Sequence, residues 1–246
     1  MKYLAISFFL LISSSAFEQN VKPKIEIYVS PGFFLETLSK DTLVPKDRRN
    51  VSRLGDVASY AMQLTTPLKN DHFTIKAGVG LSTRHYSINK YSLDDLFINL
   101  FLFDSQLRRD SSKISYIRFT NKYFQVPLSA AYRLTNLTSG FQLTAGLNLK
   151  SDFLTKAKAQ VDFDSSFQIP TQQELLAAKN EYTKNTSKII VTVEPVVEGS
   201  FMVYKNYGLM FQVRPFSFYT SKLDKRLTTS TVEIFSSTFG VFYKFK

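Results

Sequence analysis

The sequence predicts an all-β fold, an eight-stranded antiparallel up-and-down β-barrel. Eight long segments alternate between apolar residues and polar or small residues, which is the pattern of strands whose two faces meet different surroundings. The connections between these segments alternate between long and short, as between neighbouring antiparallel strands. Helices do not alternate with strands along the chain, so a parallel sheet is not expected.

The segment 123–134 shows the alternation most clearly. Its small or polar face includes Arg133. Its apolar face consists of Phe124, Val126, Leu128, Ala130, Tyr132 and Leu134. Successive side chains of a strand point to opposite sides, so this strand has one apolar face and one polar face. Either face could line the interior of a barrel.

The first three strands are expected within 24–38, 53–66 and 73–84. The first contains Pro31, which cannot donate a hydrogen bond to a neighbouring strand and predicts a bulge or bend at that point. The second and third strands are separated by a tight turn at 67–71 and therefore form a hairpin.

A long connection is expected at 87–115. Its segment 93–103 is almost entirely apolar from Leu96 onwards, and Ser92 would cap a short helix. Two interpretations remain open: a plug packed on the barrel mouth, or a surface that binds a partner. The plug is favoured, because exposed apolar patches are costly to maintain.

The fourth strand contains 123–134 and could begin as early as Ile114, and the fifth covers 141–150. The second long connection is expected at 155–188. Within it, Thr171 and a glutamate three residues later form a capping box, which predicts a short helix to about residue 182.

The last three strands are expected at 189–201, 209–214 and 235–245. A short turn at 205–208 joins the first two of them. A basic loop at 221–226 precedes the final strand. The short helices of the fold are therefore expected in the long loops.

Two classes of barrel share this topology. A lipocalin-like barrel turns its apolar face inward, whereas a membrane barrel turns that face outward to lipid. The polar face of the strands here combines small residues with charged residues of both signs, which suits the narrow lumen of an eight-stranded barrel. The predicted lumen charge network comprises Glu26, Lys76, Arg84, Arg133, Lys150, Glu194, Glu198 and Arg214.

The apolar face is bulky along every strand and would overfill an eight-stranded interior. A transmembrane barrel is therefore favoured, with a soluble periplasmic lipocalin-like lipid-binding barrel as the alternative. The predicted lipid-facing residues are Phe124, Val126, Leu128, Phe141, Leu143, Leu147, Val191, Val193, Phe211, Phe239 and Val241.

The N-terminus predicts export. Lys2 is followed by an apolar run at 4–12 and small residues at 13–16, which is the pattern of a secretory signal peptide. The apolar run is too short to span a bilayer. The expected organisation is a signal peptide at 1–16 and an outer-membrane barrel domain at 17–246. Both termini are then expected in the periplasm of a bacterium, with the long loops outside the cell.

The formal net charge is +11 and there is no cysteine, which excludes disulfides and thiolate metal sites. Because the basic residues are scattered and no helix carries a basic stripe, nucleic acid is not an expected partner. A basic outer rim facing anionic lipid head groups is expected instead.

His85 and Ser87 have a spacing that resembles the His-x-Ser of outer-membrane lipid A deacylases, in which a histidine activates a serine. The orienting acid would be Asp94, Asp95 or another loop residue. A lipid A-modifying hydrolase is therefore a second alternative function. The favoured interpretation assigns no catalytic residue to this chain and predicts that it is not an enzyme.

Glu194 and Glu198 lie four residues apart on one strand face. They could perform acid–base chemistry or form salt bridges to Arg133, Arg214 or Lys150. Salt bridges are favoured, because unpaired buried charges are costly. The lumen is then closed rather than a pore. No phosphate loop, metal-ligand cluster or cofactor motif is apparent, so no cofactor or metal site is assigned.

Two segments carry a family resemblance. Tyr-Phe-Gln-Val-Pro-Leu at 123–128 and Gly-Val-Phe-Tyr-Lys-Phe at 240–245 resemble strands of PorT-like outer-membrane β-barrel proteins of Bacteroidetes-type bacteria. The resemblance implies an outer-membrane barrel, and some members are associated with the type IX secretion and gliding apparatus. The expected role is thus structural or protein-interacting, for a monomer whose partners are outer-membrane lipid and possible envelope or secretion-complex proteins.

Overall fold

The computed structural model consists of nine strands on one continuous sheet. The strands are β1 (Lys24–Leu38), β2 (Ser52–Pro67), β3 (Phe73–Asn89), β4 (Ile114–Arg133), β5 (Phe141–Phe163), β6 (Ile189–Tyr204), β7 (Tyr207–Arg214), β8 (Ser217–Tyr219) and β9 (Thr229–Lys244). The residues that the structure describes are 23–38, 52–68, 72–89, 114–135, 140–163, 171–173, 176, 180, 183, 186–220 and 229–245.

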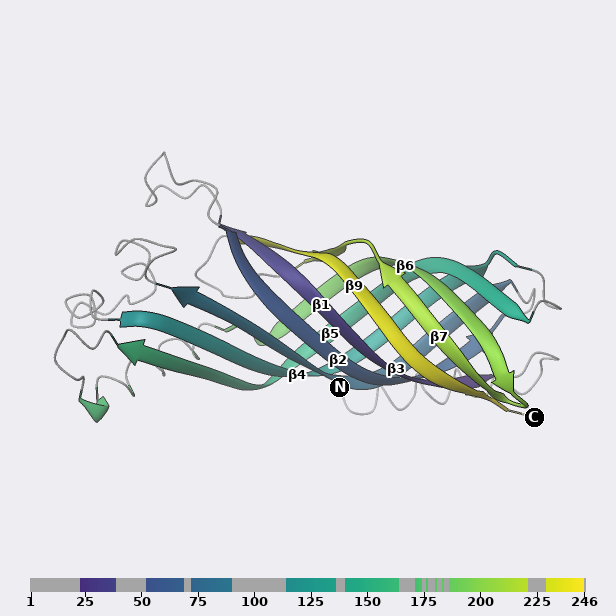
Figure 1. The fold of residues 1–246 in the computed structure, drawn as a ribbon, viewed down its shortest axis with the longest axis horizontal. Helices are drawn as coiled ribbons and strands as arrows, with labels where there is room; N and C mark the ends of the chain where they lie inside the picture. Colours follow the sequence, from purple (N-terminus) through teal and green to yellow (C-terminus); the bar gives the residue numbers. More distant parts are fainter. Residues whose placement is uncertain are drawn as a thin grey trace.

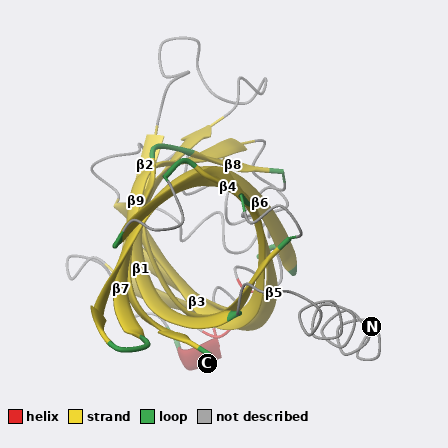
Figure 2. Ribbon diagram, turned by 90° about the vertical axis from the view of Figure 1, so that its right-hand side faces the viewer, coloured by secondary structure: helices red, strands yellow, loops and turns green. Residues whose placement is uncertain are grey.

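The strands close into a ring. Each strand from β1 to β6 pairs antiparallel with the next, β7 pairs with β9, and β9 pairs with β1 to complete the circle. The short β8 pairs with the same two neighbours as β7, namely β6 and β9, so β7 and β8 form one interrupted strand. Figure 2 looks into the resulting ring. The predicted eight-stranded antiparallel up-and-down barrel is confirmed.

Pro215 explains why the seventh strand is interrupted. A proline has no backbone N–H and cannot donate to the ladder, so strands tend to break or bulge at it. Pro31 behaves differently from the prediction. The register between β1 and β9 is the same on either side of Pro31, and the irregularity falls between Phe33 and Phe34. The prediction of a bulge at Pro31 was therefore wrong by two residues.

Several strands are longer than predicted. β3 continues to Asn89, β9 begins at Thr229, and β5 continues to Phe163, where the sequence predicted a connection from residue 155. Figure 1 shows β3, β4 and β5 extending at the end of the barrel opposite the C-terminus. The prediction failed on β5 because the alternation shifts there by one residue.

That shift is a β-bulge. Tyr123 of β4 pairs with Leu154 of β5, but the preceding Lys122 pairs with Lys156, so Thr155 is an extra residue. The Thr155 hydroxyl donates a hydrogen bond of 2.9 Å to the Lys122 carbonyl. An inserted residue reverses which residues face outward, so a strict two-residue period no longer identifies the strand.

Helical structure occurs in the second long connection, where residues 172, 173, 176, 180 and 183 are helical, in agreement with the predicted short helix. The apolar segment 93–103 and the predicted signal peptide at 1–16 lie outside the described residues. Among the residues that the structure describes, no helix is long and apolar enough to span a bilayer.

Candidate functional site

The barrel interior is filled by three clusters of charged and polar side chains, one above another. The lower cluster lies nearest the short turns and contains Lys24 and Glu26 of β1, Lys76 of β3 and Glu198 of β6. Lys76 Nζ donates to Glu26 Oε2 at 3.0 Å and also to Glu198. Lys24 Nζ lies 2.8 Å from Glu26 and 3.5 Å from Glu198. Two ammonium groups therefore alternate with two carboxylates.

The middle cluster is centred on Glu194 of β6. Its carboxylate lies 2.5 Å from Lys150 Nζ and 3.1 Å from Arg214 Nη1. It also accepts hydrogen bonds from Asn148 at 2.9 Å and from Ser217 at 3.0 Å. Four donors on one carboxylate replace the water that this buried group would otherwise bind.

Arg214 links the middle cluster to the closing strands. Besides its ion pair with Glu194, its Nη2 atom donates to the hydroxyl groups of Ser30 on β1 and Thr238 on β9. Arg214 is buried, with 2% of the whole residue exposed. A single side chain thus joins four of the strands across the interior.

The upper cluster lies toward the long loops. Arg84 Nη2 is 2.6 Å from Asp152 Oδ2, and Gln125 Nε2 donates to Asp152 Oδ1 at 2.9 Å. The Arg84 guanidinium also lies over the rings of Tyr123, 4.9 Å away, and Tyr219, 5.4 Å away. Stacking and ion pairing together hold a buried arginine in one position.

Some of these contacts cross the lumen. In the ring of eight strands, β3 and β6 are three strands apart, and the Lys76–Glu198 pair joins them. Glu26, Glu194 and Asp152 are 0% exposed. Carboxylates that are so enclosed and so completely engaged fit a structural role, because acid–base chemistry requires access for a substrate.

The structure places all eight residues of the predicted charge network in the interior. Glu194 has two of its predicted partners, Lys150 and Arg214. The predicted partners of Glu198 were wrong: it pairs with Lys24 and Lys76 instead. The reason is that ion pairs across a barrel depend on strand tilt and stagger, which a single strand's sequence does not contain.

Sequence reasoning missed two charged members of the network. Asp152 continues the inward alternation of Lys150 by two residues, and Lys24 precedes Glu26 by two, so the alternation itself could have identified both. Gln125 and Gln212 add further donors. Gln212 Nε2 donates to Glu198 at 2.6 Å.

The outer face of the barrel is apolar. Every predicted lipid-facing residue lies on this face, exposed or half-exposed, and Leu147, Phe239 and Val241 are 59%, 52% and 52% exposed. Among the described residues, buried polar and charged side chains outnumber buried apolar ones. The usual arrangement of a water-soluble protein is therefore inverted.

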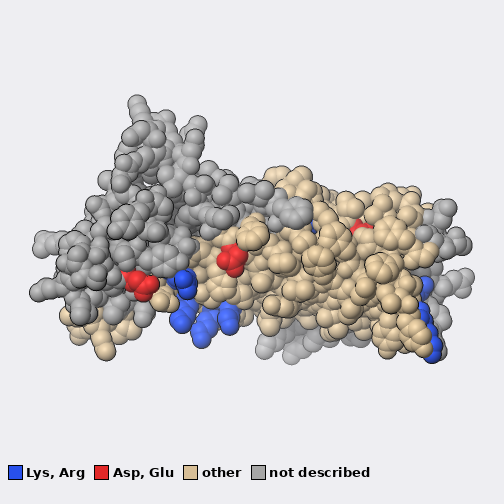
Figure 3. All heavy atoms as spheres, in the orientation of Figure 1, with Lys and Arg blue, Asp and Glu red and all other residues tan. Residues whose placement is uncertain are grey.

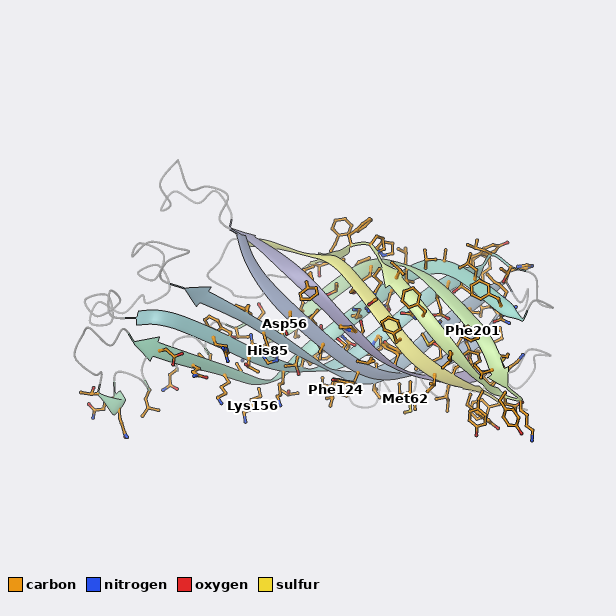
Figure 4. All side chains as sticks on the ribbon, in the orientation of Figure 1. Asp56, Met62, His85, Phe124, Lys156 and Phe201 are labelled. Carbon is orange, nitrogen blue, oxygen red and sulfur yellow. The ribbon has the colours of Figure 1, made fainter. Side chains whose placement is uncertain are left out.

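Figure 3 shows this apolar outer face as a broad tan band with lysine and arginine gathered at its two ends. Aromatic rings border the band at the short-turn end. Phe73 and Tyr132 meet edge to face, with ring centroids 5.0 Å apart, and Tyr207 and Tyr243 lie 5.0 Å apart. Figure 4 places Phe201 at this end, with Met62 and Phe124 further along the band.

His85 lies on the outer face, not in the lumen. Its Nδ1 atom is 3.0 Å from the hydroxyl oxygen of Thr120. The Ser87 side chain, Asp94 and Asp95 lie outside the described residues. Within the described part of the chain, no group of three or more His, Asp or Glu side chains is arranged to hold a metal ion.

No protein-family model matches the chain, and no curated protein matches it. Solved structures similar to it include Neisserial surface protein A (NspA), at 12% identity and a TM-score of 0.36, covering 90% of this chain and 97% of that one. Ail, the attachment invasion locus protein of Yersinia pestis, solved with the heparin analogue sucrose octasulfate, shows 14% identity, a TM-score of 0.31 and coverage of 90% and 99%.

The outer membrane protein OprG of Pseudomonas aeruginosa is similar at 12% identity and a TM-score of 0.36, covering 89% of this chain and 95% of that one. Superpositions with TM-scores this low carry no functional argument.

Proposed function

We propose that this protein is a bacterial outer-membrane β-barrel that spans the bilayer with a closed polar lumen and serves a structural or protein-interaction role. The observation that carries the proposal is the inverted burial. Charged side chains such as Glu194 are buried in the interior, whereas the apolar side chains of Leu147 and Phe239 are exposed on the outer face. A continuous apolar exterior of this size is stable only when hydrocarbon surrounds it.

The height of the apolar band supports the same conclusion. On β4 the outward residues from Phe124 to Leu134 are apolar. Ten residues at about 3.4 Å each, on a strand tilted by about 45°, rise about 24 Å along the barrel axis. This height agrees with the band of about 25 Å that lipid covers in such barrels.

The closed lumen follows from the three clusters of charged side chains. The Lys76–Glu198 pair joins β3 to β6 across the interior, and the Arg214–Glu194 pair joins the neighbouring strands β7 and β6. An ion crossing the barrel would have to break these pairs in a confined space, which is costly. The protein is therefore expected to insert into membranes without conducting ions.

Orientation follows from loop lengths. β1 begins and β9 ends at the same end of the barrel, where Lys24 pairs with Lys244, and by the usual arrangement of outer-membrane barrels this end faces the periplasm. β5 continues past Phe153, the last residue that pairs with β6, for ten residues to Phe163. The β4–β5 ribbon at the other end then projects beyond the lipid, where it is available to a partner.

An envelope-assembly role, such as a place in type IX secretion, is the finer part of the proposal. Its support is the PorT-like resemblance of 123–128 and 240–245. Affinity purification from native membranes in mild detergent tests this role. Co-purification of a defined set of envelope proteins supports it, and recovery of the barrel alone, with a second tagged barrel as control, contradicts it.

The two alternatives fit the geometry less well. A lipocalin-like carrier requires an apolar cavity for its ligand, whereas the interior here contains ion pairs such as Arg84–Asp152. A lipid A hydrolase requires a base beside its nucleophile, and the described partner of His85 is Thr120.

Membrane fractionation tests the central proposal. The protein is expected to stay with membranes through high salt and osmotic shock and to float with lipid in a density gradient. It is also expected to migrate faster on gels before heating than after, since intact barrels resist detergent. Release by osmotic shock without detergent would contradict the proposal.

A further inference from the structure

The apolar band ends sharply on the outer face of β2–β5. Its last row runs in register across the four strands through Tyr60, Leu81, Phe124 and Phe153. The first three are 61%, 61% and 40% exposed. If the band lies in lipid, Phe124 and Phe153 mark where hydrocarbon gives way to head groups along β4 and β5 on the long-loop side.

Two polar rows follow directly. The first contains Thr83, Lys122 and Lys156, paired across β3, β4 and β5. The second contains Asp56, His85, Thr120 and Lys158, paired across β2 to β5. Figure 4 shows Asp56, His85 and Lys156 beyond Phe124 toward the long loops, and Figure 3 shows basic side chains gathered beside the apolar surface.

The bulge at Thr155 places the lysines on this face. Before it, odd-numbered residues of β5 such as Phe153 point outward. After it, Lys156 and Lys158 are exposed, whereas Ala159 is buried at 3%. If strict alternation had continued through Thr155 without a bulge, Ala157 and Ala159 would continue the outer face and the lysines would point into the lumen.

The arrangement concentrates positive charge, and the exposed carboxylate on the same face of β5, Asp162, lies four residues or about 14 Å beyond Lys158. Lys122 and Lys156 are directly opposite on neighbouring strands, where like charges destabilise the pair. Among the described residues, no carboxylate forms an ion pair with Lys122, Lys156 or Lys158. Asp56 lies at the far end of its row, three strand spacings or about 14 Å from Lys158.

We propose that Lys122, Lys156 and Lys158 form a binding site for the phosphate groups of a membrane lipid whose acyl chains pack on Phe124 and Phe153. This inference rests on the proposed function, because the site requires the apolar band to lie in lipid. The lipid phosphate supplies the negative charge that the opposed lysines lack. The hydroxyl of Thr120, between His85 and Lys158, adds a neutral hydrogen-bonding group.

Lipid binding by the purified barrel tests the site. The probes are lipid A with two phosphates and the same lipid A after both phosphates are removed, with binding to the barrel in detergent measured by native mass spectrometry. The wild type is expected to prefer the phosphorylated form at least tenfold. Equal binding of the two forms would overturn the inference, as would equally tight binding of inorganic phosphate alone.

Matched double variants locate the site. K156Q/K158Q is expected to weaken binding of phosphorylated lipid A about 25-fold, since each lysine at an anionic lipid surface contributes about fivefold. The control K205Q/K244Q removes the same charge from exposed lysines at the opposite end of the barrel and is expected to change binding less than twofold. Equal losses in both variants would contradict a site at the β4–β5 bulge.

Flotation of each variant with lipid separates this inference from the proposed function. A wild-type protein that floats but shows no preference for phosphorylated lipid A overturns the lipid site alone. A wild-type protein that does not float overturns the membrane barrel and the lipid site together.

Discussion

Arg84 and Asp152 form an ion pair of 2.6 Å inside the barrel, although 68 residues separate them in the chain. Arg84 belongs to β3 and Asp152 to β5, with β4 between them. Both residues are at most 3% exposed. The pair shows how the pairing of consecutive strands, rather than proximity in sequence, brings compensating charges together.

Breaking this pair should destabilise the barrel. D152N leaves the Arg84 charge buried with a neutral partner, which typically costs about 3–5 kcal/mol. The expected result is a lower midpoint of urea unfolding, followed by the β-sheet circular dichroism signal in detergent or lipid. In R84M/D152L both charges are removed, and more than half of the lost stability should return. A double variant that is less stable than D152N would contradict this explanation.

The outward face should tolerate charge only beyond the apolar band. Leu147 lies at the middle of the band on β5, so L147R should cost about 2–4 kcal/mol in unfolding free energy measured in lipid vesicles. Gln160, exposed on the same strand beyond the band, is the control, and Q160R should change stability by less than about 1 kcal/mol. Equal, small effects at both positions would indicate water rather than lipid outside the barrel.

The lumen should not conduct. Planar-bilayer recordings of the wild type are expected to show no steady channel, because the Lys76–Glu198 pair crosses the interior. The triple variant E26A/K76A/E198A removes three of the four charged groups of the lower cluster and should increase the frequency of small openings. A steady, large conductance from the wild-type barrel would rule out a closed lumen.

Gly146 should resist substitution because its neighbours leave no room. A Cβ atom there would lie 2.2 Å from the Ala130 carbonyl oxygen and 2.8 Å from the Ala131 Cβ atom. G146A should therefore destabilise the barrel by about 1–3 kcal/mol, the usual cost of overpacking. Gly140, where nothing lies within 4 Å of a new Cβ atom, provides the control, and G140A should be neutral in the same unfolding measurement.

The strand count and the two faces were predictable because they depend on local alternation. A residue and its second neighbour share a side of any strand, so the inward position of Lys150 and the outward position of Leu147 follow from the sequence. Bulky apolar residues on one side and small or charged ones on the other then indicate which face turns inward. The same alternation would have placed Asp152 in the lumen had it been extended by one more pair of residues.

The pairing of charges was not predictable in the same way. Glu198 pairs with Lys24 and Lys76, rather than with the expected Arg133, Arg214 or Lys150. The tilt and stagger of the strands determine which residues lie at the same height in the lumen, and a single strand's sequence does not contain this information. The bulge at Thr155 is equally non-local, since an extra residue is accommodated only when β4 provides the carbonyl that receives its hydroxyl.

The amino-acid sequence by itself determined that the chain forms a barrel and which face of most strands is apolar. The tertiary structure alone decided which charged side chains form ion pairs inside the barrel. It also placed Lys156 and Lys158 on the outer face, beside Lys122. The physical reason is that side-chain direction has a period of two residues within each strand, whereas register and closure arise only when neighbouring strands pair.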